Sequence, residues 1–184
     1  MLYFKFDCDK AIAVTLFVSK RLTDEFGEKG ADLHKLFKIL YFADQKHLVR
    51  YGRPIVGDHY IAMSHGPVPS NIYDMMKSVR GGGYFEAPTA LNGFFEVFEH
   101  FVFPKQEPDL DELSESDLEC LEESLAENKH LDFNELKQKS HDRAHQRAAK
   151  DDRISYLEIA VAGGADESSL HLMKLYSENE NTLP

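Results

Sequence analysis

The segment from residue 31 to residue 51 constrains the fold of this chain more than any other. Its apolar residues recur at spacings of three and four, which is the pattern of a helix face. Ile39 and Phe42 widen that face until apolar residues cover most of the helix circumference. Because such a helix must be surrounded by protein, we predict that it lies at the centre of the domain. Gly52 is the expected C-terminal stop, with Pro54 just beyond it.

Most of the remaining chain is expected to form further helices. Apolar residues at helical spacing predict a first helix over residues 9–26. Five more are expected to begin near residue 70 and to cover residues 115–128, 133–149, 153–162 and 167–178. Helix caps are expected at Asp7 or Asp9, at Ser114 with Asp117, and at Asp132 with Glu135. The proline- and acid-rich residues 104–114 are interpreted as a linker.

Short extended segments interrupt the helices. Gly57-Asp58 has the composition of a two-residue hairpin turn between apolar arms at 55–56 and 60–61, and a rigid Gly-Pro turn follows. Residues 84–103 form the more convincing extended segment, with Asn92-Gly93 as the turn between aromatic-rich arms. We therefore predict a mainly α fold, a single compact helical domain over residues 1–184 with a small antiparallel β-hairpin.

The composition predicts a cytoplasmic protein. Cys8 and Cys120 are too few for a disulfide framework and are expected to be thiols in a reducing compartment. No segment reaches the roughly 18 apolar residues that a membrane span needs. The apolar run at 11–18 follows acidic residues and precedes no cleavage site, so we interpret it as a buried helix face and not a signal sequence.

The net charge of −11 is unevenly distributed. Residues 104–135 contain twelve acidic side chains against two lysines, whereas residues 33–53 contain five basic side chains against one aspartate. Nucleic-acid binders need a basic surface to contact phosphates, so nucleic acid is an unlikely partner. The charge asymmetry favours a charged protein surface as the partner, although a solvated helix face would also explain the acidic stretch.

A small metal-dependent hydrolase is one alternative function. His141 and His145 lie four residues apart on one predicted helix, and Asp142 lies beside the first of them. A third ligand at a diagnostic spacing is missing, as are phosphate-binding loops and nucleophile motifs, so we expect no metal and no cofactor. A DNA-binding regulator is a second alternative, which the acidic composition argues against.

The stretch from residue 35 to residue 69 is dense in polar side chains and rigid turns. These side chains can have a structural role, in which Asp44 pairs with Arg53 and Tyr60 adds a hydrogen bond. They can also form a recognition surface, because rigid turns flanked by aromatic and basic residues lose little entropy on binding.

The same stretch carries a resemblance to a known family. "KLFKILYFADQKHLVRYGRPIVGDHYIAMSHGPVPSNIYD" closely resembles the signature of the Panacea domain, found in SocA-like antitoxins and phage-associated proteins. The resemblance covers about residues 10–175 and is strongest over 35–73. It implies a mainly helical domain without established catalytic activity. It also implies a cognate toxin protein as partner and, as in one branch of the family, a bacterial ATP-dependent protease to which the toxin is delivered.

We assign roles to the signature residues on this basis. The residues expected to contact the partner are Lys38, Arg53, Tyr60, His65 and Tyr73. The residues expected to hold the fold are Leu36, Leu40, Tyr41, Gly52, Pro54, Gly57, Asp58, Gly66 and Pro67. We further expect the acidic stretch from Glu107 to Glu127 to cover a basic groove on the toxin if that toxin acts on RNA.

Overall fold

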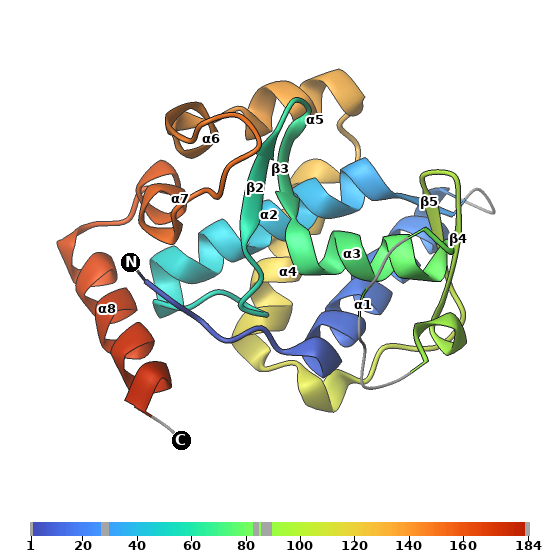
Figure 1. Cartoon of the computed structure of the whole chain (residues 1–184), viewed down its shortest axis with the longest axis horizontal. Helices are drawn as coiled ribbons and strands as arrows, with labels where there is room; N and C mark the ends of the chain where they lie inside the picture. The colour runs from blue at the N-terminus through green and yellow to red at the C-terminus, as the bar shows by residue number, and fades with distance from the viewer. Residues whose placement is uncertain (1, 27–29, 83–84, 86–89, 183–184) are drawn as a thin grey trace.

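A computed structural model describes residues 2–26, 30–82, 85 and 90–182 (Figure 1). The elements in chain order are α1 (Cys8–Phe26), β1 (Ala31–Asp32), α2 (Leu33–Tyr51), β2 (Tyr60–Met63), β3 (Gly66–Pro69), α3 (Ser70–Val79), the 3-10 helix η1 (Leu91–Gly93), β4 (Phe95–Phe98), β5 (Phe101–Pro104), the 3-10 helix η2 (Leu110–Glu112), α4 (Glu115–Asn128), α5 (Phe133–Ser140), α6 (Arg143–Arg147), α7 (Tyr156–Ala162) and α8 (Glu167–Thr182). The fold is mainly α with minor antiparallel β-structure, as predicted. None of the helices in these residues combines the length and hydrophobicity that a bilayer crossing requires.

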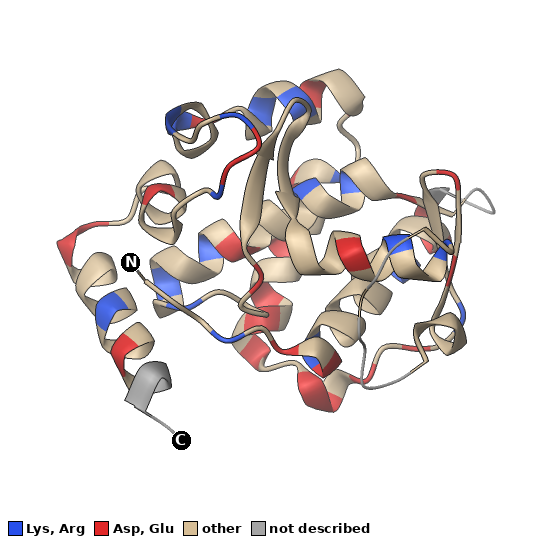
Figure 2. Ribbon diagram, in the orientation of Figure 1, with Lys and Arg blue, Asp and Glu red and all other residues tan. Residues whose placement is uncertain are grey.

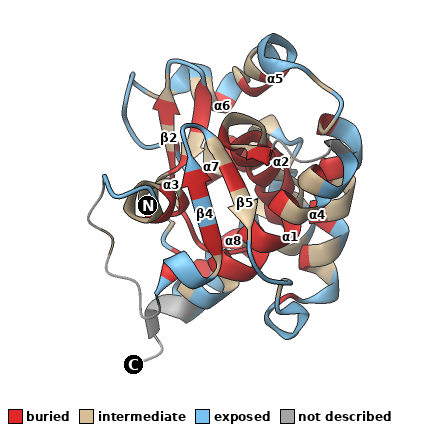
Figure 3. Cartoon of the chain, turned by 90° about the vertical axis from the view of Figure 1, so that its right-hand side faces the viewer, coloured by how far each residue is buried: buried red, intermediate tan, exposed pale blue. Residues whose placement is uncertain are grey.

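Helix α2 is the central element, which confirms the strongest sequence prediction. It packs against α4, α7, α8, α5 and β3. Its side chains enter two apolar clusters: Leu36 and Phe37 pack with α1, α3 and the β4–β5 hairpin, whereas Tyr41 and Phe42 pack with α6 and α7. Figure 3 shows the buried residues along the elements that face one another and the exposed residues on the outer turns.

The predicted helix boundaries and caps are largely correct. The Asp7 carboxylate accepts a hydrogen bond from the Lys10 N–H at the start of α1. Capping boxes form at Ser114 with Asp117 and at Asp132 with Glu135. Gly52 ends α2 in the left-handed conformation at φ 72°, and its N–H returns to the Leu48 carbonyl.

The helix predicted over residues 133–149 is in fact two helices. α5 ends at Ser140, and α6 begins at Arg143. The cause is Asp142, whose backbone is extended and whose carboxylate accepts the His145 N–H. An aspartate that caps a new helix in this way satisfies its first N–H groups and stops the previous helix.

The first predicted hairpin turn is wrong. The observed hairpin pairs β2 with β3, and the chain turns at Ser64 and His65 rather than at Gly57-Asp58. Gly57 has φ 72°, and a Cβ there would lie 2.1 Å from the Lys5 carbonyl oxygen. Residues 55–57 therefore pack against the N-terminal segment, where the Asp7 N–H bonds to the Val56 carbonyl, and do not pair with β2.

The second hairpin lies near its predicted place, but its turn is wrong. Asn92-Gly93 belongs to η1, and β4 pairs with β5 across Glu99 and His100. β1 pairs with the other edge of β5, which gives the order β1-β5-β4. Glu99 supplies the positive φ of 53° that the tight connection needs. Most of the predicted extended segment before residue 90 lies outside the described residues.

Candidate functional site

The C-terminal half of α2 carries a buried carboxylate that organises the following loop. Asp44 accepts hydrogen bonds from the Ile55 N–H at 2.7 Å and from the Tyr60 hydroxyl at 2.8 Å. Burial raises the pKa of Asp44, and these two hydrogen bonds oppose that rise. Tyr60 is itself almost fully buried, so its hydroxyl holds the hairpin to α2.

A second buried network joins α2 to the start of α4. His47 contacts the Asp117 carboxylate at 3.1 Å, and Arg53 contacts the same carboxylate at 3.2 Å. Lys10 of α1 forms a further ion pair with it. Burial alone would raise the pKa of Asp117, but the hydrogen bonds from His47, Lys10 and Ser114 and the charge of Arg53 outweigh it and lower that pKa. The suggested Asp44–Arg53 pair does not form, because Arg53 forms its ion pair with Asp117 instead.

Asp58 has a capping role and is not part of a turn. Its carboxylate accepts the N–H groups of Asn71 and Ile72 at 2.9 Å, at the N-terminus of α3. Its carbonyl oxygen accepts a hydrogen bond from the Tyr156 hydroxyl. Burial raises the pKa of Asp58 to about 6 against the effect of these backbone donors.

Lys38 is a buried cationic side chain behind the β2–β3 hairpin. Its ammonium donates to the Pro67 carbonyl at 2.7 Å, and no described carboxylate forms an ion pair with it. Burial lowers the pKa of Lys38 to about 7. Gly66, at φ 100°, lets the strand approach, since a Cβ there would lie 2.8 Å from Lys38 Cε and 2.3 Å from Ser140 Oγ.

The exposed end of this hairpin forms a compact aromatic surface. His34 of α2 bonds through Nε2 to the His65 carbonyl at 3.1 Å. The Phe133 ring lies 4.2 Å from the His34 ring and 5.3 Å from the His65 ring. Phe133 is 46% exposed, and His65 is exposed as well. We call His34, His65 and Phe133 the hairpin-tip surface.

The residues of the metal-site alternative have other partners. The Asp142 carboxylate accepts hydrogen bonds from Tyr41 at 2.8 Å and from Gln45 at 3.0 Å. His145 Nε2 lies 2.9 Å from the Met63 carbonyl, and its ring stacks on that of His141 at 4.2 Å. Within the described residues, no group of three potential ligands is arranged to hold a metal ion.

The five residues predicted to contact a partner are not gathered in one place. Lys38 and Tyr60 are buried, so the expectation that both are presented on the surface is wrong. Arg53 is half-buried against Asp117, and Tyr73 is half-buried between Phe37 and the Lys77 ammonium. Only His65 is well exposed. The nine signature residues expected to hold the fold are all buried: Leu36, Leu40, Tyr41, Gly52, Pro54, Gly57, Asp58, Gly66 and Pro67.

Sequence reasoning missed Phe133 and His34. Phe133 follows a helix cap and His34 lies on the edge of an apolar helix, so neither carries a local signal. The fold brings them together because α5 packs against β3 and α2.

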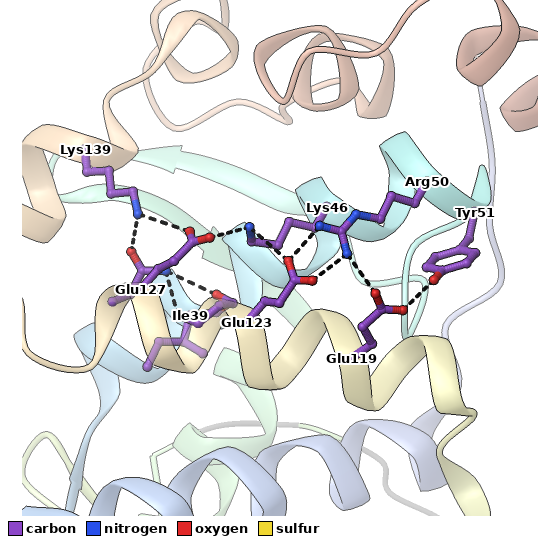
Figure 4. A network of polar contacts seen from close by, with 10 residues as sticks. Ile39, Lys46, Arg50, Tyr51, Glu119, Glu123, Glu127 and Lys139 are labelled. Atoms are coloured by element: carbon purple, nitrogen blue, oxygen red, sulfur yellow. Dashed lines mark hydrogen bonds and ion pairs between the residues drawn. The ribbon is translucent and has the colours of Figure 1, made fainter.

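The acidic and basic stretches of the sequence meet in the fold. Three glutamates of α4 at intervals of four face the cations of α2 along one line, which we call the α2–α4 seam (Figure 4). Its members are Lys46, Arg50, Tyr51, Glu119, Glu123, Glu127 and Lys139. Arg50 holds Glu123 through two bonds of 2.7 Å. Beneath the seam, Ser124 donates to the Ile39 carbonyl.

A group of uncompensated charges lies just before α4 and at its first residue. Glu107 and Glu122 pair with Lys20 and Arg21 of α1. In contrast, four exposed acidic residues have no ion-pair partner within the described residues: Asp109, Asp111, Glu112 and Glu115. Figure 2 shows red, the colour of Asp and Glu, along the ribbon where the chain enters α4.

A comparison with known protein families identifies the domain. Residues 36–145 match the model described as "Antitoxin SocA-like, Panacea domain". The chain belongs to this family. The match contains the whole hairpin-tip surface except His34, and it contains the α2–α4 seam. The family implies a role related to toxin–antitoxin systems and, in general terms, a toxin as partner. Searches of curated proteins and of solved structures found no match.

Proposed function

We propose that this protein is an antitoxin that neutralises a cognate toxin by binding it directly and covering its functional face. The observation that carries the proposal is the match to the SocA-like antitoxin family over residues 36–145. The buried networks around Asp44, Asp58 and Asp117 support it, because they hold the signature segment in one conformation before any partner arrives. A preorganised surface loses less conformational entropy on binding.

The hairpin-tip surface is the proposed centre of contact. Phe133 and His65 offer exposed aromatic area, and aromatic residues supply much of the energy of protein interfaces. Lys38 and Gly66 support this surface from behind and contribute to binding only by positioning it. Arg53 and Tyr73, each half-exposed at most, are assigned a secondary role.

Co-expression with the product of the neighbouring reading frame tests the proposal. The wild-type chain is expected to copurify with that product and to restore growth of cells that produce it. The double variant His65→Ala/Phe133→Ala is expected to lose rescue while its circular dichroism remains that of the wild type. Phe98→Ala is the matched control, because Phe98 is a more exposed aromatic residue at the end of β4, in the unrelated β4–β5 hairpin.

The outcomes separate the function from the surface. A wild-type chain that neither copurifies with the neighbouring product nor suppresses its toxicity would contradict the proposed function. Full rescue by the double variant would contradict the surface alone. Tyr60→Ala and Lys38→Ala are expected to lose rescue by unfolding, since both side chains are buried.

The fate of the toxin distinguishes occlusion from delivery to a protease. A protease adaptor would lower the toxin level in cells that contain an ATP-dependent protease and leave it unchanged in cells that lack the enzyme. Simple occlusion would leave the toxin intact in both. We place this activity in the cytoplasm, which the two free thiols, Cys8 and Cys120, support.

A further inference from the structure

Two surface clefts of about 300 Å³ each lie along α1. The first, between α1 and the end of α4, is bordered by two ion pairs, Arg21 with Glu122 and Lys129 with Glu25, and by the single carboxylate of Asp24. The second lies between the first turns of α1 and the segment before α4. Because the two clefts have about the same volume, they differ mainly in the charge of the residues that line them.

The second cleft has an apolar floor and an acidic rim. Its floor is formed by Ile12, Ala13, Leu16 and Phe94. Its rim carries four carboxylates, from Asp9, Glu107, Asp109 and Glu112. We call these residues the acidic cleft.

Most of the rim charge is uncompensated. Glu107 pairs with Lys20, but the described residues provide no ion-pair partner for the other three rim carboxylates. Asp109 caps η2 by accepting the Asp111 N–H, which leaves its negative charge in place. Exposed carboxylates that lie close together repel one another, and this repulsion falls when a cation binds between them.

We propose that the acidic cleft receives a lysine- or arginine-bearing segment of the toxin, with one apolar side chain of that segment on the cleft floor. The inference rests on the proposed function and names the part of the partner that this cleft recognises. The rim selects basic side chains by charge complementarity. The floor selects against a fully polar segment, because the half-buried Phe94 ring gains contact only from an apolar group.

The acidic cleft and the hairpin-tip surface are built from different elements. The hairpin tip lies at the top of Figure 1, whereas the first turn of α1 lies at the bottom. The contribution of each surface to binding can therefore be removed without altering the other.

The test measures affinity between the purified chain and the purified product of the neighbouring reading frame at low and at physiological salt. Asp109→Asn/Glu112→Gln is expected to weaken binding roughly tenfold at low salt and to reduce the salt dependence. Glu167→Gln/Glu178→Gln on α8 makes the same change in net charge. Helix α8 contributes no residue to the acidic cleft and lies at the left edge of the molecule in Figure 1. This control is expected to bind within twofold of the wild type.

A variant that fills the cleft distinguishes insertion of a toxin segment into the cleft from long-range electrostatic attraction to its rim. Ala13→Leu places a larger side chain on the floor and is expected to weaken binding at both salt concentrations, with folding checked by circular dichroism. Wild-type affinity in the rim variant, or in a folded Ala13→Leu variant, would overturn the inference while the antitoxin function stands. A wild-type chain that does not bind the product removes the proposed function and this inference together.

Discussion

The α2–α4 seam and the acidic cleft both take glutamates and aspartates from the same acidic stretch of sequence. These carboxylates form ion pairs in the seam, whereas most of them are unpaired in the cleft. In the seam, Glu119, Glu123 and Glu127 lie at intervals of four on a helix, so they form a row opposite the cations of α2 (Figure 4). In the cleft, Asp109 and Glu112 precede α4 and lie beside the apolar first turns of α1. The contrast shows that a charged stretch becomes a charged surface only where the fold places no opposite charge beside it.

Helix α4 also carries a buried charge in its first turn, just before the seam, and the cleft has no such charge. Asp117 is fully buried at the start of α4 and is held by three basic side chains, whereas the rim carboxylates are exposed. Removal of a paired charge along α4 should therefore affect stability, and charge removal at the cleft should affect affinity.

The largest effect is expected for Asp117→Asn. The change leaves Lys10 and Arg53 facing a neutral amide, which should lower the free energy of unfolding by about 3 kcal/mol at pH 7. The folded state lowers the pKa of Asp117 below the pKa of about 4 that the residue has in the unfolded chain. The contribution of Asp117 to folding stability is therefore complete above about pH 4 and is lost as the pH falls below it. The variant should therefore lose less stability than the wild type between pH 5 and pH 3 in urea titrations.

Glu115→Gln is the control for that experiment. Glu115 lies two residues away on the same helix turn, but it is exposed and has no ion-pair partner in the described chain. A loss of stability equal to that of Asp117→Asn would show that the general charge of this turn, and not the buried network, stabilises the fold.

Lys38→Met is expected to change how stability depends on pH. The folded pKa of about 7 is lower than the unfolded value of 10.5, so the unfolded state binds more protons between these values. The wild type should therefore gain about 2 kcal/mol of stability from Lys38 between pH 7 and pH 9. The variant should lack this gain, as measured by urea denaturation at each pH.

Lys46→Met on the same helix is the matched control for Lys38. Lys46 pairs with Glu123 and Glu127 in the seam, and these contacts raise its pKa against the effect of burial. The control should keep the wild-type gain in stability on going from pH 7 to pH 9. An unchanged gain in Lys38→Met would mean that the buried ammonium stays charged in the folded protein.

The smallest effect compares a half-buried, paired glutamate with an exposed, unpaired one. Glu123→Gln removes the paired contact with Arg50 and is expected to lower stability by about 0.5–1 kcal/mol at low salt. Glu112→Gln removes an unpaired rim charge and should leave stability unchanged within about 0.5 kcal/mol. Thermal unfolding at two salt concentrations measures both, and equal losses would erase the distinction between seam and cleft.

Local chemistry alone was enough to predict much of this protein. The apolar arc of α2, the capping boxes at Ser114 and Asp132, and the glycine stop at Gly52 all follow from contacts within a few residues. The family signature could likewise be read directly from the linear pattern, and the family match confirms it.

Tertiary structure decided what depends on residues far apart in the chain. Lys38 and Tyr60 are polar and look like surface residues in the sequence, but the fold buries them against Pro67 and Asp44. Gly57 resembles a hairpin turn, but the N-terminal segment packs on it. The acidic stretch looks uniform, yet α2 neutralises one part and leaves the other exposed. In each case the deciding partner is distant in sequence, and burial and charge pairing depend on that partner's position in space.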